Sequence, residues 1–221
     1  MSRVPLLRPE FGPTLPEVIG RRFSVSKRAV GIAAIVLLIL LAVVIKVVTD
    51  NGLNKLVVHG TPSFNVLYDP SALHEATPQG GELMHLAGRA GHVDVALTAR
   101  HANLPAFKGD TIGGLLPLYT AQLANRLSKQ LPGFQMGTEG KARVNQAPGY
   151  QITYTSKAGG NPTIWREVFV MPAADKPAQT IDLLMRQTFN GRPGRRGRAL
   201  VQATRKAFRS FRFGTSRPLF G

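Results

Sequence analysis

The chain has no cysteine, and this absence excludes several kinds of chemistry. Disulfide bonds, thiolate zinc sites and a cysteine nucleophile all require the missing side chain. Exported domains meet an oxidising environment in which free thiols react, so the absence of cysteine fits an exported protein.

Acidic residues are scarce, and none of the 12 lies beyond Asp182. Residues 183–221 carry ten Lys and Arg and no acid, which is a net charge of +10. Residues 1–28 carry six basic and two acidic side chains, and residues 29–182 carry twelve and ten, for net charges of +4 and +2. The formal charge of +16 therefore belongs to the two ends of the chain, while the middle is nearly neutral.

The usual catalytic motifs are missing or incomplete. His74 and Glu75 begin like a zinc-protease H-E-x-x-H motif, but Pro78 stands where the second histidine is needed. Lys141 follows a glycine as in a phosphate-binding loop, but Gln135 and Ala142 occupy positions that require glycine and a hydroxyl residue. We therefore expect no enzyme activity, no catalytic residue and no cofactor.

Histidine leaves one alternative open for a metal ion. If the first strands of the folded domain pair, five histidines could approach Asp94. Histidines in strands and turns are more often surface residues, so we expect no metal site. The histidines are His59, His74, His85, His92 and His101.

Residues 29–48 form the one long apolar run, AVGIAAIVLLILLAVVIKVV, with Lys46 as its only charge. At a rise of about 1.5 Å per residue, a helix of this length crosses a hydrocarbon core of about 30 Å. A cleaved signal peptide is disfavoured because 28 residues precede the run and no A-x-A pattern follows it. The sequence predicts an uncleaved transmembrane helix.

The charges that flank the run predict its orientation. Lys and Arg near a membrane span stay preferentially on the cytoplasmic side. Only Lys46 and Lys55 lie soon after the centre of the run, whereas four basic residues precede it: Arg21, Arg22, Lys27 and Arg28. We expect a single-pass plasma-membrane protein with a cytoplasmic N-terminus and an extracytoplasmic C-terminal domain.

The N-terminal leader is rich in proline and arginine, and two interpretations of it stay open. It either sets the membrane topology through its arginines or presents apolar side chains to a cytoplasmic protein partner, as a signalling link would require. Those side chains are Leu6, Leu7, Phe11 and Leu15.

The remaining sequence alternates strand and helix patterns. A helix is predicted from Asp110 to the Pro132-Gly133 pair, with a kink at Pro117. A closing helix is predicted by Leu200, Thr204, Phe208 and Phe211, which fall on one stripe. Strands are predicted at 64–68, at 82–88 and 92–100 as a hairpin, at 134–144, at 150–156 and 163–171 as a second hairpin, and at 179–189. This order indicates an α+β domain with a mostly antiparallel sheet flanked by helices.

The order of elements, the closing "AFRSFRFG" and the hairpin "PGYQITYT…TIWREVFVMP" resemble the Mog1/PsbP-like α/β/α sandwich. That domain is found in single-pass or lipid-anchored envelope proteins of actinobacteria. The resemblance covers about residues 61–214 and implies a binding or assembly module without catalysis. It assigns no functional residue, because the shared motifs mark strands and a packed helix.

The expected organisation has five parts: a cytoplasmic leader at 1–28, a transmembrane helix at 29–48, a linker at 49–60, an exported α+β domain at 61–214 and a tail at 215–221. We expect a non-enzymatic binding or assembly module of the bacterial cell envelope. An enzyme that acts on an envelope polymer is the alternative.

The basic C-terminal region supplies the candidate site. Its loop "GRPGRRGR" is an expected contact for anionic lipid or an anionic envelope polymer, through Arg192, Arg195, Arg196 and Arg198. A solvated loop is the plain alternative. Nucleic acid is not an expected partner, because the predicted topology places this region outside the cytoplasm.

Overall fold

The structure is a computed structural model that describes residues 31–32, 34–42, 52–173 and 176–215. The chain divides into two compact units, residues 1–50 and 51–221, which are described separately.

In the first unit, residues 31–32 and 34–42 are helical and their side chains are exposed. Among the described residues, no helix has both the length and the apolar character that a membrane crossing requires. The other residues of the predicted span at 29–48 lie outside the described part of the chain, as does the leader at 1–28. The transmembrane helix stays a prediction.

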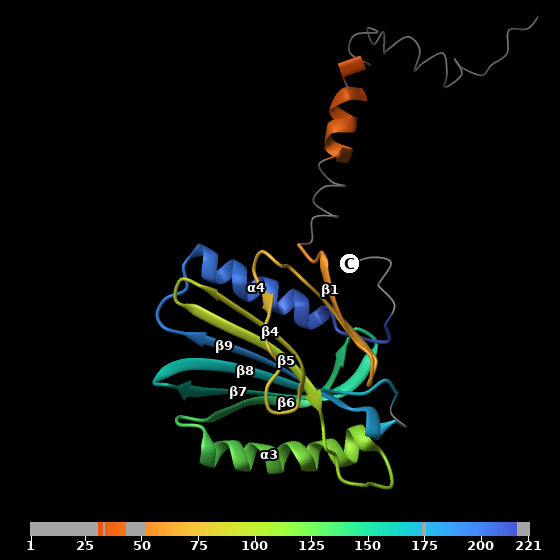
Figure 1. Ribbon diagram of the computed structural model, residues 1–221, viewed down its shortest axis with the longest axis vertical. Helices are drawn as coiled ribbons and strands as arrows, with labels where there is room; N and C mark the ends of the chain where they lie inside the picture. The colour runs from red at the N-terminus through yellow and green to blue at the C-terminus, as the bar shows by residue number, and fades with distance from the viewer. Residues whose placement is uncertain (1–30, 33, 43–51, 174–175, 216–221) are drawn as a thin grey trace, which may run out of the picture. The chain divides into compact units, whose positions relative to one another are not determined.

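The second unit is built on two antiparallel sheets (Figure 1). The large sheet has seven strands in the order β3 (His74–Glu75), β4 (Glu82–Ala90), β5 (Val93–His101), β9 (Ile181–Phe189), β8 (Asn161–Val170), β7 (Ala147–Ala158) and β6 (Gln135–Val144). The small sheet has the order β1 (Lys55–His59), β2 (Phe64–Tyr68) and β10 (Arg212–Phe213). The helices are α3 (Leu116–Gln130) and α4 (Arg195–Ser210), with short helical turns at Thr111–Leu115 and Pro177–Gln179.

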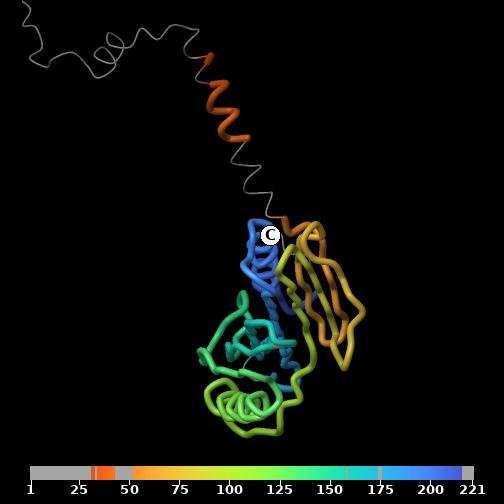
Figure 2. The backbone as a smooth tube through the Cα atoms, turned by 90° about the vertical axis from the view of Figure 1, so that its left-hand side faces the viewer, coloured from red at the N-terminus to blue at the C-terminus, as the bar shows by residue number. Residues whose placement is uncertain are grey.

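The large sheet separates the two helices, as Figures 1 and 2 both show. On one face, α4 and the small sheet close over the main core, which includes Phe64, Leu97, Leu183 and Phe208. On the other face, α3 covers a smaller core around Phe169. Because successive strand residues point to opposite faces, each strand that lies between the two layers buries side chains on both.

The predicted hairpins are present. β4 pairs with β5, and β7 pairs with β8 through a turn in which Gly159 and Gly160 have φ of 58° and 82°. Both values lie in the left-handed region that a two-residue hairpin turn requires and that glycine adopts without strain. The predicted strand at 179–189 is β9, which lies between β5 and β8.

The predicted closing helix is α4, and its apolar stripe is buried. Phe208 and Phe211 are buried, and Leu200 and Thr204 are buried on the same stripe. The mostly antiparallel α+β architecture predicted from the sequence is thereby confirmed.

Two details differ from the expectation. Residues Lys55–His59, inside the expected linker at 49–60, form β1 and pair with β2. The expected single α-helix is instead a π-helical turn at Thr111–Leu115 followed by α3 from Leu116, so Pro117 falls in the first turn of α3 and not in the interior of an α-helix. A proline there loses no helical hydrogen bond, since the first N–H groups of a helix have no partner within it. Asp110 caps the preceding turn by accepting a hydrogen bond from the Ile112 N–H at 2.9 Å.

Candidate anion-binding surface

Helix α4 separates its side chains by size and charge. Small and apolar residues recur at helical spacing and are buried against the sheets: Gly197, Leu200, Ala203, Thr204, Ala207 and Phe208. Between them, basic side chains are exposed: Arg195, Arg196, Arg198, Arg205, Lys206 and Arg209. The burial of one stripe therefore leaves a basic stripe toward solvent.

The structure brings the four candidate arginines to one end of this helix. Arg192 lies in the loop after β9, and Arg195, Arg196 and Arg198 lie in the first turn of α4. All four are exposed. Arg198 donates a hydrogen bond from Nη1 to the Pro193 carbonyl oxygen at 3.0 Å. Each ion pair found within the described ranges joins other residues.

This end of α4 lacks the negative charge that a helix start normally carries. Its N-cap residue is Gly194, which makes no side-chain capping bond, and the first turn holds no acid. The helix dipole places partial positive charge at this point, so each arginine here is unfavourable by about 0.3–1 kcal/mol. An anion at this position would be attracted by the arginines and by the free N–H groups together.

The other basic residues of the C-terminal region do not form one surface. Arg186 lies on β9, on the sheet face opposite α4, with its guanidinium carbon 5.8 Å from the centre of the Trp165 ring. Arg212 lies on β10, and Arg217 is outside the described residues. The continuous run of basic residues in the sequence is thus divided among several parts of the fold.

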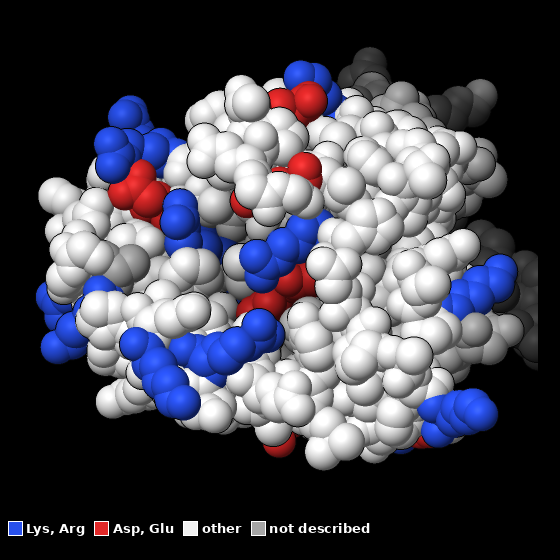
Figure 3. Space-filling view, turned by 60° about the horizontal axis from the view of Figure 1, so that its bottom comes forward, with Lys and Arg blue, Asp and Glu red and all other residues white. Residues whose placement is uncertain are grey.

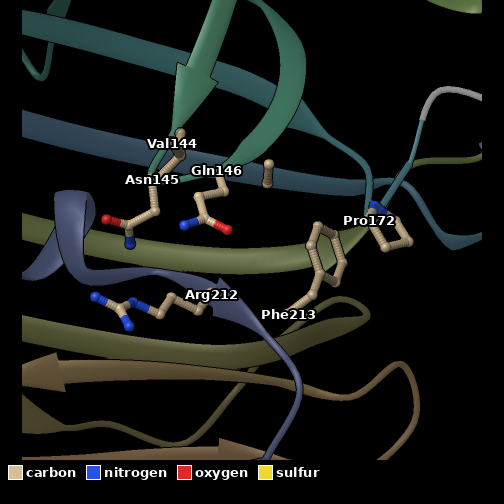
Figure 4. A pocket seen from close by; sticks show the side chains of 7 residues that line it. Val144, Asn145, Gln146, Pro172, Arg212 and Phe213 are labelled. Atoms are coloured by element: carbon tan, nitrogen blue, oxygen red, sulfur yellow. The ribbon is translucent and has the colours of Figure 1, made fainter. Parts of the chain in front are cut away.

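A cavity of about 620 Å³ opens beside the turn between β6 and β7 (Figure 4). Asn145 in that turn has φ of 52°, and its Nδ2 donates to the Phe211 carbonyl oxygen at 2.6 Å. Figure 4 shows the side chains of Asn145 and Gln146 on one side and Arg212 on the other. These three side chains offer hydrogen-bonding groups and one cation.

A buried network of charges was not anticipated from the sequence. Glu167 in β8 and Asp182 in β9 are 1% and 3% exposed. Arg100 in β5 donates from Nε to Asp182 Oδ2 at 2.5 Å and from Nη2 to Glu167 Oε1 at 3.3 Å. The Tyr154 hydroxyl in β7 donates to Glu167 Oε2 at 3.1 Å. The network therefore connects four neighbouring strands.

Burial controls the protonation of this network. It raises the pKa of Glu167 well above the ordinary value, and the negative charge of Asp182 adds to the effect. Burial also raises the pKa of Asp182, against the opposing charge of Arg100. Two carboxyl groups here face one guanidinium, so the pair retains a proton at pH values where an exposed Glu is ionised.

The position of these carboxyl groups favours a structural role. Both oxygens of Glu167 accept hydrogen bonds from the protein itself. Figure 3 shows one face of the molecule on which Lys and Arg side chains gather around a hollow that contains acidic side chains. A signal for the network exists in the sequence, because Asp182 stands between Ile181 and Leu183 and Glu167 comes directly before the apolar residues 168–170. Their shared partner, 82 and 67 residues away, carries no local signal.

The histidines do not converge on a metal site. Within the described ranges, no three His, Asp or Glu side chains lie close enough together to hold an ion. His59 contacts the Pro62 carbonyl oxygen, and His85 pairs with Glu82. Asp94, the acid considered as their shared ligand, is engaged by Arg89 and Asn190.

Comparison with known proteins finds similar solved structures but no similar sequence. No family model matches the chain, and no curated protein sequence does. Similar solved structures include the cyanobacterial PsbP of Synechocystis sp. PCC 6803, at 9% identity and a TM-score of 0.45, covering 72% of this chain and 91% of that one. Another is LpqN, involved in cell envelope biogenesis of Mycobacterium tuberculosis, at 13% identity and a TM-score of 0.41, covering 71% and 88%.

A third is a Pseudomonas aeruginosa protein of unknown function, at 13% identity and a TM-score of 0.36, covering 70% of this chain and 92% of that one. The structural neighbours thus include a PsbP-like protein and a cell-envelope protein. With TM-scores below 0.5, no residue role or activity is transferred from them. Membership of the Mog1/PsbP-like family stays a prediction.

Proposed function

We propose that the protein is a non-enzymatic binding or assembly module of the bacterial cell envelope, anchored in the plasma membrane by residues 29–48. In this proposal the start of α4 contacts an anionic surface, either lipid headgroups or an envelope polymer. One observation carries it: four exposed arginines, Arg192, Arg195, Arg196 and Arg198, gather at a helix start that has no acidic residue.

The strength of such a contact follows from the number of charges. Each Lys or Arg near an anionic membrane surface contributes about 1 kcal/mol before screening, so four arginines hold the domain weakly. A membrane anchor compensates for weak affinity, because it keeps the local concentration of the surface high. The predicted span and the basic helix start therefore support the same proposal.

The test is co-sedimentation of residues 51–221 with lipid vesicles. This stretch is a compact unit with its own core, and circular dichroism is used to check that each protein is folded. We expect binding to vesicles that contain phosphatidylglycerol, none to neutral phosphatidylcholine vesicles, and loss of binding at high salt. Changing all four arginines, Arg192, Arg195, Arg196 and Arg198, to Gln should abolish it.

A matched variant separates the site from the net charge. In this variant, four exposed basic residues outside α4 are replaced by Gln, so that it loses the same number of positive charges as the first variant. The residues are Lys108, Arg126, Lys129 and Lys157. This variant should keep at least about half of the binding, since charges beyond a Debye length of about 10 Å contribute little. Equal losses in the two variants would show that only the net charge matters, and the proposed site would be wrong.

A further inference from the structure

A second group of arginines lies near the other end of α4, and its core is Arg166 in β8. The strand alternates, so Arg166 points to the same face as the buried Val168 and Val170, toward α4. Its guanidinium carbon lies 4.9 Å from the centre of the Phe208 ring, and its Nη2 donates to Gln151 Oε1 at 2.9 Å. These two contacts hold the half-buried guanidinium in one place.

Two further arginines of α4 lie close to this group. Arg205 and Arg209 are four residues apart, so their side chains neighbour each other on the helix surface. They stand on either side of Phe208 in sequence. Burial is the largest cause that lowers the pKa of Arg166, and the positive charges of Arg209 and Arg205 lower it further. Three guanidinium groups thus act on one another.

No acid balances these charges. None of the ion pairs in the described part of the chain involves Arg166, Arg205 or Arg209. Glu167, the next residue along β8, points to the opposite face and pairs with Arg100. The neighbouring stretch of chain from residue 183 onward has no acidic residue at all.

The arrangement is unfavourable for a protein without a ligand. Like charges at i, i+4 destabilise a helix, and the Nε of Arg166 is buried without a hydrogen-bond partner. A buried donor without a partner destabilises the fold, and a charged one does so more strongly. The helix dipole favours a cation at Arg209 in the last turn, but it does not account for Arg166, which lies on a strand.

We infer that Arg166, Arg205 and Arg209 form a binding site for a compact multivalent oxyanion, a phosphate or a sulfate group. Guanidinium groups recognise such groups through paired N–H donors, and three of them match the charge of a phosphate monoester better than that of a singly charged diester. Arg166 supplies the fixed donor, and the two arginines of α4 close over the anion from the solvent side.

This site is separate from the proposed contact at the helix start. Six residues of α4, 199–204, lie between Arg198 and Arg205, and this separation of seven positions corresponds to about 10 Å along the helix. The inference therefore goes beyond the proposed function, and either can fail alone. The anion is free inorganic phosphate or the phosphate monoester headgroup of a lipid, and the two sources share the same chemistry.

Calorimetric titration of the full chain in neutral detergent micelles tests the site. Inorganic phosphate is added at constant ionic strength, with chloride as the reference anion. We expect saturable binding whose affinity falls at least about tenfold in the double variant Arg205→Gln/Arg209→Gln, since hydrogen bonds to charged groups are the strong ones. Both residues are exposed, so this variant should fold like the native protein.

The matched control is Arg126→Gln/Lys129→Gln, which removes two exposed charges from α3 on the other face of the large sheet and should bind phosphate within about twofold of the native affinity. Arg166→Gln should lose binding, and Arg166→Lys should recover only part of it, because lysine lacks the paired donors. Thermal unfolding shows whether either variant at residue 166 is folded.

A second titration identifies the source of the anion. Micelles doped with phosphatidic acid, which carries a phosphate monoester, replace inorganic phosphate. Binding that requires Arg205 and Arg209 in both titrations indicates any phosphate monoester, and such binding only to doped micelles indicates a lipid headgroup. Equal affinity in the native protein and Arg205→Gln/Arg209→Gln, or no binding to either probe, would overturn the inference.

Discussion

At the scale of single residues, Glu167 is a costly side chain to bury, since it is 1% exposed. A buried carboxylate is stable only when partners replace the water it has lost, and Glu167 shares its one cationic partner, Arg100, with Asp182. Burial of this carboxyl group is unfavourable, and it is offset in part by hydrogen bonds that join β5, β9, β8 and β7. The free energy of unfolding should therefore depend on pH in a way that reports the protonation of Glu167.

Glu167→Gln is the substitution that isolates the charge. The raised pKa means that the folded protein holds this proton more tightly than the unfolded chain does. The free energy of unfolding therefore falls as pH rises from the ordinary Glu value through the raised folded value. Gln has no proton to lose, so Glu167→Gln should resemble the native protein near pH 4 and exceed its stability by about 1 kcal/mol or more above neutral pH.

Urea unfolding at a series of pH values measures this effect through Trp165, the only tryptophan, which stacks on Tyr154 beside the network. Glu167→Ala is the contrasting variant. It leaves Arg100 Nη2 and the Tyr154 hydroxyl without their acceptor and should lose about 3 kcal/mol at every pH. A Glu167→Gln protein whose stability follows the native pH curve would show that Glu167 is not the group that holds the proton.

At the scale of elements, the contact between α4 and β5 depends on a glycine. A Cβ at Gly197 would lie 2.7 Å from Val93 Cγ2 and 3.4 Å from the Ala90 carbonyl oxygen. Gly197 therefore lets the first turn of α4 approach the strand closely, and it also fixes where the neighbouring arginines emerge.

Gly197→Ala should destabilise the domain despite the better helix propensity of alanine. The propensity gain is about 1 kcal/mol, while overpacking costs about 1–3 kcal/mol, and a branched side chain on a central strand has little freedom to move. We expect a lower melting temperature by circular dichroism. In a Val93→Ala background the clash is removed, so the same Gly197→Ala change should be neutral or stabilising. Destabilisation of equal size in both backgrounds would contradict the packing argument.

Elements with a strong local pattern could be predicted from the sequence. The hairpins have turn glycines, and α4 has a stripe that includes Leu200 and Phe208, so their patterns indicate both type and place. β1 was not predicted, because the short apolar stretch around Val57 and Val58 follows the long apolar run and carries no pattern that marks a separate strand. Its pairing with β2 defines the strand. The position of β9 between β5 and β8 depends on long-range pairing, which leaves no local signal.

The candidate sites divide in the same way. The arginines at the start of α4 stand next to one another in the sequence and could be predicted as a group. The cluster of Arg166, Arg205 and Arg209 and the network around Glu167 join residues from different elements, so they appear only once the strands are paired and the helix is packed. Local periodicity predicts which face a residue occupies, but not which distant residue shares it.

At the scale of the whole molecule, the sequence places its long apolar run near one end and its uncompensated basic charge at the other. If the apolar run crosses the membrane with its basic flank in the cytoplasm, the basic helix lies outside, where anionic lipids and envelope polymers are the available partners. The function proposed for α4 therefore depends on the topology, which is open to a direct test.

The absence of cysteine makes that test simple, since any introduced cysteine is the only one in the chain. Ser2→Cys lies in the predicted cytoplasmic leader, and Gln202→Cys lies on the exposed side of α4. In intact cells, a membrane-impermeant maleimide should label Gln202→Cys alone, and Ser2→Cys should react only after permeabilisation. The protein should also stay with the membrane through alkaline carbonate extraction, because a span of about 20 apolar residues is held by the hydrophobic effect and not by charge.

Neutralising the N-terminal flank is the informative control. Changing Arg21, Arg22, Lys27 and Arg28 to Gln removes the charges that are expected to hold the leader inside, so a fraction of the molecules should insert in the opposite orientation and expose Ser2→Cys to the reagent. Labelling of Ser2→Cys in intact cells without these changes would place the leader outside and α4 in the cytoplasm. Anionic partners of α4 would then have to be sought among cytoplasmic polyanions.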